Sequence, residues 1–107
     1  MSRFSKGDIV LVDLNPVKGH EQGNKRPVLV INDYPLPGGI NTILSITTKA
    51  KSYPLEVSLD NRTTTQGVVQ CYQIRTLDLD KRNAVFLEHA PADIVDTCVE
   101  YVTRLIE

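Results

Sequence analysis

The chain has 107 residues, with 41% hydrophobic residues, 23% charged residues and a formal net charge of −1 at pH 7. This composition is typical of a globular protein and excludes a disordered or fibrous one. The length suits a single domain over residues 1–107 with one modest core, and the net charge argues against binding nucleic acid through a global positive field.

The sequence has no signal for a membrane segment, a disulfide framework or a metal site. The first apolar run, Ile9 to Val12, is far shorter than a membrane span or the apolar region of a signal peptide, so we expect a cytoplasmic protein. Cys71 and Cys98 are too few and too far apart for a disulfide framework, and no zinc-ligand spacing is present. We therefore expect reduced thiols and no structural metal.

Six segments have the β-branched or alternating pattern of short strands and are separated by turn residues. In chain order they are residues 8–14, 26–32, 42–47, 55–59, 68–77 and 83–88. After the second segment, two prolines and the Gly38–Gly39 pair mark a candidate mobile flap. The fifth segment is long and contains polar residues, so we expect a bent strand with one face toward solvent or a ligand.

Residues 90–107 are predicted to form a helix. Pro91 suits its first turn, and Asp93 complements the positive end of the helix dipole. One buried face is predicted from apolar residues at helical spacing: Val95, Val99, Val102 and Ile106, widened by Ile94, Cys98 and Leu105. Because strands and helices do not alternate, we expect a mainly β protein with a C-terminal helix (α+β), built as a small, strongly bent sheet or barrel.

The segment "KGHEQGNKRPVLVIN", residues 18–32, places charge and glycine directly before an apolar strand. A solvated hairpin tip accounts for this pattern, because loops are usually charged. The functional alternative rests on chemistry: His20 titrates near neutral pH, Glu21 can accept a proton, and Arg26 can hold a phosphate with two hydrogen bonds. Both interpretations stay open on these residues alone.

Two further polar sets accompany predicted strands. At the end of the third strand stand Thr47, Thr48, Lys49 and Lys51. Their hydroxyl and ammonium groups suit phosphate contacts as well as simple exposure to solvent. The fifth strand carries Gln70, Tyr72, Gln73 and Arg75. These are either surface residues or groups that stack on and read nucleic-acid bases.

Three stretches, in this order and spacing, resemble the MazF/PemK/Kid family of toxin–antitoxin ribonucleases: "GDIVLVDLNPVKGHEQGNKRPVLVIN", "SITTKAKSYPLEVSL" and "QGVVQCYQIRTLD". The resemblance covers residues 6 to about 80, and "GHEQ" followed by "RPVLV" resembles the Kid/PemK branch most closely. It implies a small SH3-like β-barrel with helices. It also implies a homodimer whose interface shapes an RNA-binding groove.

The resemblance implies a toxin that cleaves single-stranded RNA, often mRNA, at short sequence motifs without a metal or other cofactor. In this reaction the ribose 2′-hydroxyl attacks the adjacent phosphate and leaves a 2′,3′-cyclic phosphate and a 5′-hydroxyl. Such chemistry needs a base, an acid and cations that stabilise the developing charge.

Matched position by position, the resemblance implies catalytic roles for His20, Glu21, Arg26 and Thr47. The first two match the family's HEQ or SEQ loop, the arginine matches its RP motif, and Thr47 with Thr48 matches its hydroxyl pair. Substrate binding is expected from Thr48, Lys49, Gln70, Tyr72, Gln73 and Arg75.

Two positions depart from the Kid-like pattern. Gln70 and Tyr72 stand where Kid-like members have an arginine and an aspartate, which are assigned as acid and base in that branch. Glutamine exchanges no proton usefully, and an ordinary tyrosine is a poor base at neutral pH. Proton transfer is therefore expected from His20, Glu21 and Arg26.

Two other functions stay open: a CcdB-like toxin that binds DNA gyrase, and a weak or non-catalytic module that only dimerises and binds antitoxin. The HEQ loop, Arg26 and Thr47 favour the ribonuclease. The resemblance implies a cognate antitoxin with an acidic, disordered C-terminal segment. Residues 1–53, with a net charge of +3 against −4 for residues 54–107, suit that segment. Operator DNA is expected to be contacted only through the antitoxin, and no membrane is expected as a partner.

Overall fold

The computed structural model describes residues 3–14 and 25–107, which form six strands, a short 3₁₀ helix and one α-helix. In chain order the elements are β1 (Asp8–Asp13), β2 (Lys25–Val30), η1 (Pro37–Gly39), β3 (Asn41–Thr47), β4 (Glu56–Ser58), β5 (Val68–Leu77), β6 (Val85–His89) and α1 (Ala92–Ile106). Each predicted strand is present, and the predicted helix begins directly after Pro91. The fold class expected from the sequence is confirmed.

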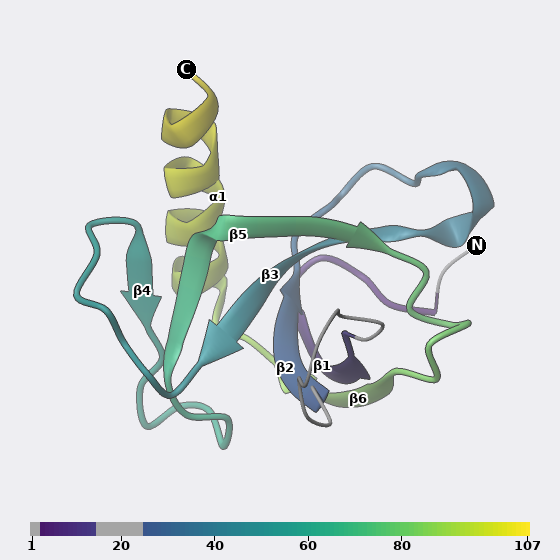
Figure 1. The fold of residues 1–107 in the computed structure, drawn as a ribbon, viewed down its shortest axis with the longest axis horizontal. Coiled ribbons are helices and arrows are strands. Elements are labelled where there is room, and N and C mark those ends of the chain that lie inside the picture. The colour runs from purple at the N-terminus through teal and green to yellow at the C-terminus, as the bar shows by residue number, and fades with distance from the viewer. Residues whose placement is uncertain (1–2, 15–24) are drawn as a thin grey trace, which may run out of the picture.

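The strands form one antiparallel sheet in the order β4-β5-β3-β2-β1-β6 (Figure 1). Strand β2 ends two residues earlier than predicted. At that point Asn32 Oδ1 accepts the backbone N–H of Thr42 at 3.0 Å, so a side chain replaces strand pairing. Helix α1 stands against β5 and β4, on one side of the sheet (Figure 1).

Strand β5 bends sharply in its middle (Figure 1), as its length and polar residues predicted. The β3 partner of Ile74 is Leu44, but the β3 partner of Gln70 is Ser45, the next residue along. The three residues between, Cys71 to Gln73, are left out of the ladder and form the bend. The first half of β5 therefore pairs with both β4 and β3, whereas the second half pairs with β3.

The alternation of side chains along the strands divides the core into two apolar clusters, one on each face of the sheet. One cluster joins the sheet to α1: Ile9, Leu29, Leu44, Ile46, Val69 and Cys71 with Ile94, Val95 and Cys98. The other lies on the opposite face: Phe4, Val10, Val12, Leu14, Val28, Val30, Ile43, Leu77, Leu79 and Ala84. Both cysteines are buried as free thiols, as expected.

Helix α1 buries its apolar face mainly in its first half. Ile94, Val95 and Cys98 are buried, whereas Leu105 and Ile106 are 45% and 77% exposed. The predicted face is therefore right near the sheet and wrong at the last turn, which extends past β5 (Figure 1). In the part of the chain that the structure describes, no helix is long and apolar enough to cross a membrane.

The loop between β4 and β5, residues 60–66, ties β6 to the opposite end of the sheet. Glu88 on β6 accepts the backbone N–H groups of Thr64 and Thr65 at 3.0 and 2.7 Å and the Thr65 hydroxyl at 2.7 Å. The Glu88 side chain thus connects edge strand β6 to the loop that follows the other edge strand, β4.

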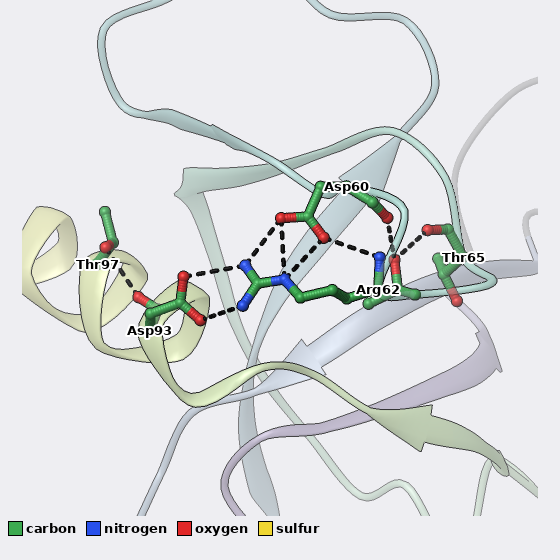
Figure 2. A network of polar contacts seen from close by, with 6 residues as sticks. Asp60, Arg62, Thr65, Asp93 and Thr97 are labelled. Carbon is green, nitrogen blue, oxygen red and sulfur yellow. Dashed lines mark hydrogen bonds and ion pairs between the residues drawn. The ribbon is translucent and has the colours of Figure 1, made fainter.

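Arg62, in the 60–66 loop, connects that loop to α1 (Figure 2). Its guanidinium donates to Asp60 at 2.8 to 3.2 Å and to the two oxygens of Asp93 at 2.8 and 3.0 Å. Arg62 lowers the pKa of Asp60 to about 2 and also lowers that of Asp93. All three groups are exposed, so solvent screens the pairs, and their main effect is to fix the position of the loop.

Candidate active site

Polar residues of β3, β4 and β5 form a row across the sheet. The register pairs Glu56 with Gln70, Gln70 with Ser45, and Ser45 with Val28. Directly paired residues of an antiparallel sheet lie on the same face. The row of Glu56, Gln70 and Ser45 therefore shares the face of Val28, opposite the face covered by α1.

Arg26 and Thr47 lie beside this polar row on the same face. The pairing of β2 with β3 ends at Val28 and Ser45, and Arg26 and Thr47 each lie two residues beyond that pair, at the same end of the two strands. Arg26 pairs with Val12 of β1, which places it on the face of Val28. Arg26 is exposed, and its guanidinium makes no hydrogen bond or ion pair with any residue that the structure describes. Thr47 is half-buried. A cation and a hydroxyl thus lie at the same end of neighbouring strands and on one face, and both groups suit contact with a phosphate.

The end of β3 is fixed by a local turn and by a close backbone contact. Thr47 Oγ1 accepts the backbone N–H of Lys49 at 3.1 Å. Gly67 has a φ of +120° and lies so near that an added Cβ atom would be 2.3 Å from the Thr47 carbonyl oxygen. Only glycine fits there without displacing the backbone. The position of Thr47 therefore depends on Gly67.

Tyr72 joins the two polar residues at the β4 end of the row. Its hydroxyl donates to Glu56 Oε2 at 2.7 Å and accepts from Gln70 Nε2 at 3.1 Å. The hydrogen bond between Tyr72 and Glu56 lowers the pKa of the carboxyl group and raises the pKa of the phenol. Tyr72 therefore stays protonated and Glu56 ionised at neutral pH, which agrees with the argument against Tyr72 as a base.

The other predicted site residues are spread more widely. Those that the structure describes are Thr48, Lys49, Gln73 and Arg75. The first two are exposed just beyond β3, the third is exposed at the bend of β5, and the fourth is half-buried in the second half of β5. His20 and Glu21 lie outside the described residues. Among the described side chains, no group of three or more His, Cys, Asp or Glu is arranged to hold a metal ion.

Sequence reasoning missed Glu56 and Tyr53. The alternating pattern marks Glu56 only as the polar side of a half-buried strand, and it gives no sign that Gln70 lies opposite. Tyr53 is 58% exposed, and its ring lies edge-on to Tyr72 with the ring centroids 5.2 Å apart. Both features depend on how β4 pairs with β5.

The family model for "PemK-like, MazF-like toxin of type II toxin-antitoxin system" matches residues 5–106. The chain belongs to this family. The matched segment spans all the strands and the helix. The polar row and Arg26 therefore lie within the region that this chain shares with the PemK-like, MazF-like toxins. The resemblance read from the sequence is confirmed.

Relatives and solved structures agree with this membership of the PemK-like, MazF-like toxins. Endoribonuclease PemK of Escherichia coli is 36% identical over 117 residues, which cover 98% of this chain and 84% of PemK. MazF of Deinococcus radiodurans superposes with a TM-score of 0.84 at 35% identity, covering 95% of this chain and 94% of MazF. A MazE–MazF structure from the same organism gives a TM-score of 0.85, with the same identity and coverage.

Proposed function

We propose that this toxin is an endoribonuclease, formed by the whole chain as one domain, which cuts single-stranded RNA at short sequence motifs without a metal ion. The observation that carries the proposal is that Arg26 and Thr47 lie at the same end of the neighbouring strands β2 and β3, on the face that carries the polar row. The 36% identity to endoribonuclease PemK supports RNA as the substrate, with mRNA as the target in the cell. A guanidinium and a hydroxyl on one face of the sheet suit the phosphate diester of RNA.

In the proposed reaction, the 2′-oxygen of a ribose attacks the adjacent phosphorus while its proton passes to a base. The bond from phosphorus to the 5′-oxygen breaks, and an acid protonates that oxygen. The products are a 2′,3′-cyclic phosphate and a 5′-hydroxyl. Arg26 stabilises the negative charge that develops on the phosphate oxygens, and Thr47 donates a hydrogen bond to one of them.

The proton transfers are assigned to the segment before and at the start of β2. Gln70 has no titrating group, and Glu56 raises the pKa of Tyr72, so neither Gln70 nor Tyr72 replaces the acid and base of Kid-like members. His20, whose ordinary pKa lies near neutrality, and Glu21 are the proposed acid and base, with Arg26 assisting.

Substrate binding is assigned to Thr48, Lys49, Gln70, Tyr72, Gln73 and Arg75. The cations among them suit phosphates, and the ring of Tyr72 and the exposed amide of Gln73 suit bases. We further propose a cytoplasmic homodimer whose interface shapes the groove. A cognate antitoxin with an acidic, disordered C-terminal segment binds there, and the MazE–MazF structure of a relative supports such a partner.

Incubation of the purified protein with a long single-stranded RNA in EDTA tests the proposal. We expect cuts at a short recurring motif, with a cyclic phosphate on one new end and a hydroxyl on the other. Cleavage that requires added Mg²⁺ contradicts the metal-independent mechanism. No cleavage, together with tight binding of antitoxin or of gyrase, contradicts the enzyme and supports a binding module of the same fold.

A further inference from the structure

Glu56, at the β4 end of the polar row, has no role in the reaction proposed above. Its carboxylate accepts the backbone N–H of Lys51 at 3.1 and 3.3 Å, the backbone N–H of Tyr53 at 3.3 Å and the hydroxyl of Tyr72 at 2.7 Å. Both oxygens are engaged, and the Tyr72 hydrogen bond in particular keeps the pKa of Glu56 below its ordinary value. Such a group is a weak base and a firm anchor.

The segment that Glu56 anchors is the lysine loop, residues 48–54, named for Lys49 and Lys51. Both lysines are exposed. The loop starts at the Thr47 turn and passes through Ser52, whose φ of 56° is rarely adopted by residues other than glycine. Glu56 holds the residues on either side of Ser52, so it maintains a backbone conformation that the chain rarely adopts unaided.

The same carboxylate also fixes an aromatic pair. It binds the backbone of Tyr53 and the hydroxyl of Tyr72, and the two rings meet edge-on at an interplanar angle of 64°. The hydroxyl of Tyr72 is occupied by Glu56 and Gln70, its ring is half-buried, and the Tyr53 ring is the more exposed of the two. Glu56 thus joins the backbone of Lys51 and of the exposed Tyr53 to the polar row.

We propose that Glu56 is a positioning residue for RNA, holding the lysine loop and the Tyr53–Tyr72 pair in the arrangement that meets the phosphates and bases of the substrate. This inference rests on the ribonuclease function proposed above. It assigns to a negatively charged residue a favourable effect on the binding of a negatively charged ligand. That sign makes the inference easy to test, because loss of the charge alone would strengthen binding.

Three variants carry the test. Glu56→Gln removes the charge and leaves one acceptor oxygen, and Tyr72→Phe removes only the hydroxyl that binds Glu56. Glu88→Gln is the matched control, because Glu88 also accepts two backbone N–H groups and one hydroxyl, but in the 60–66 loop. The Gln variants change the net charge equally. Tyr72→Phe supplies a second reading if Glu56→Gln does not fold, as judged by thermal unfolding.

The measured quantities are kcat and KM for RNA cleavage and the Kd for an oligonucleotide with a 2′-deoxy nucleotide at the cut site, which cannot be cleaved by the proposed mechanism. For Glu56→Gln and Tyr72→Phe, we expect KM and Kd to rise about tenfold while kcat changes less than about threefold. The slope of log Kd against log salt is expected to flatten by about 0.7 for each phosphate that the displaced lysine loop no longer binds. Glu88→Gln is expected to keep the wild-type KM and slope.

The outcomes separate this inference from the proposed function. If the wild-type protein cuts RNA but Glu56→Gln binds the oligonucleotide equally well or more tightly, the inference is overturned and the ribonuclease stands. A loss of kcat at constant KM also overturns it, because Glu56 would then act in the chemistry. If the wild-type protein binds the oligonucleotide without cutting RNA, the ribonuclease proposal fails. Weaker binding by Glu56→Gln then still supports the positioning role.

Discussion

The lysine loop precedes β4 in the chain and the 60–66 loop follows it, and a carboxylate binds the backbone of each loop. Glu56 binds N–H groups of the lysine loop, and Glu88 binds N–H groups of the 60–66 loop. The pKa of Glu56 is lowered mainly by the Tyr72 hydroxyl. Burial raises the pKa of Glu88, but hydrogen bonds from Thr65 and Thr64 outweigh this and leave it lowered. The anchoring chemistry of the two loops is therefore the same.

The two loops differ in what surrounds their cations. Arg62 in the 60–66 loop lies between Asp60 and Asp93, so its charge is neutralised within the protein. Lys49 and Lys51 are exposed and form no ion pair with any residue in the described part of the chain. The comparison indicates that one loop serves the fold, whereas the other keeps its cations available to an anionic ligand.

Gly67 lies where the two regions meet, and we expect its substitution to have the largest effect. Gly67→Ala combines a positive φ with a clash against the Thr47 carbonyl oxygen. We expect a loss of stability of more than about 1 kcal/mol in urea unfolding and a strong loss of RNA cleavage. Gly38→Ala is the control, since Gly38 also has a positive φ but has nothing within 4 Å of an added Cβ atom. Equal effects of both variants on cleavage would contradict the link between Gly67 and Thr47.

The ion pairs of Arg62 with Asp60 and Asp93 are expected to affect the pH dependence of stability and not RNA cleavage. The folded-state pKa values of Asp60 and Asp93 are lowered by Arg62, with Asp60 at about 2 against an ordinary 3.8. These carboxylates therefore stabilise the fold above their ordinary pKa, and the contribution is lost as pH falls through the lowered values. We expect the free energy of unfolding to fall between about pH 5 and pH 2, and less steeply in Arg62→Ala. An unchanged slope in that variant would refute the assignment.

Substitution of a single lysine is expected to have the smallest effect. Lys51→Ala removes one exposed cation from the lysine loop and should weaken RNA binding by about two- to fivefold, with a flatter salt dependence. Lys81→Ala, in the exposed turn before β6, is the matched control and should leave binding unchanged. The same small loss in both variants would indicate a general charge effect and would remove the distinction between the two loops.

Local sequence patterns were sufficient for most of the fold. The β-branched and alternating segments predicted all six strands, and a β-strand is present at each of them. Polar residues within a long strand predicted the bend of β5. Helical spacing failed at Ile106, because the pattern does not reveal where the sheet that covers the helix ends.

The candidate site was predictable only where a motif carried it. Arg26 and Thr47 follow from the family resemblance, and the pairing of β2 with β3 puts them at the same end of neighbouring strands. Glu56 is 14 positions from Gln70 in sequence but directly opposite it in the sheet, and this pairing is a long-range property that local alternation does not determine. The 60–66 loop likewise depends on Asp93, which the sequence connects only with the helix dipole.

The most direct test of the ribonuclease account is the single-turnover rate of RNA cleavage by Arg26→Ala in EDTA. Arg104→Ala, on the exposed last turn of α1, is the control for loss of an arginine. If Arg26 stabilises the developing charge on the phosphate, its removal should slow cleavage by about 10²- to 10³-fold, while the control keeps the wild-type rate. Cleavage by Arg26→Ala at the wild-type rate would contradict the account.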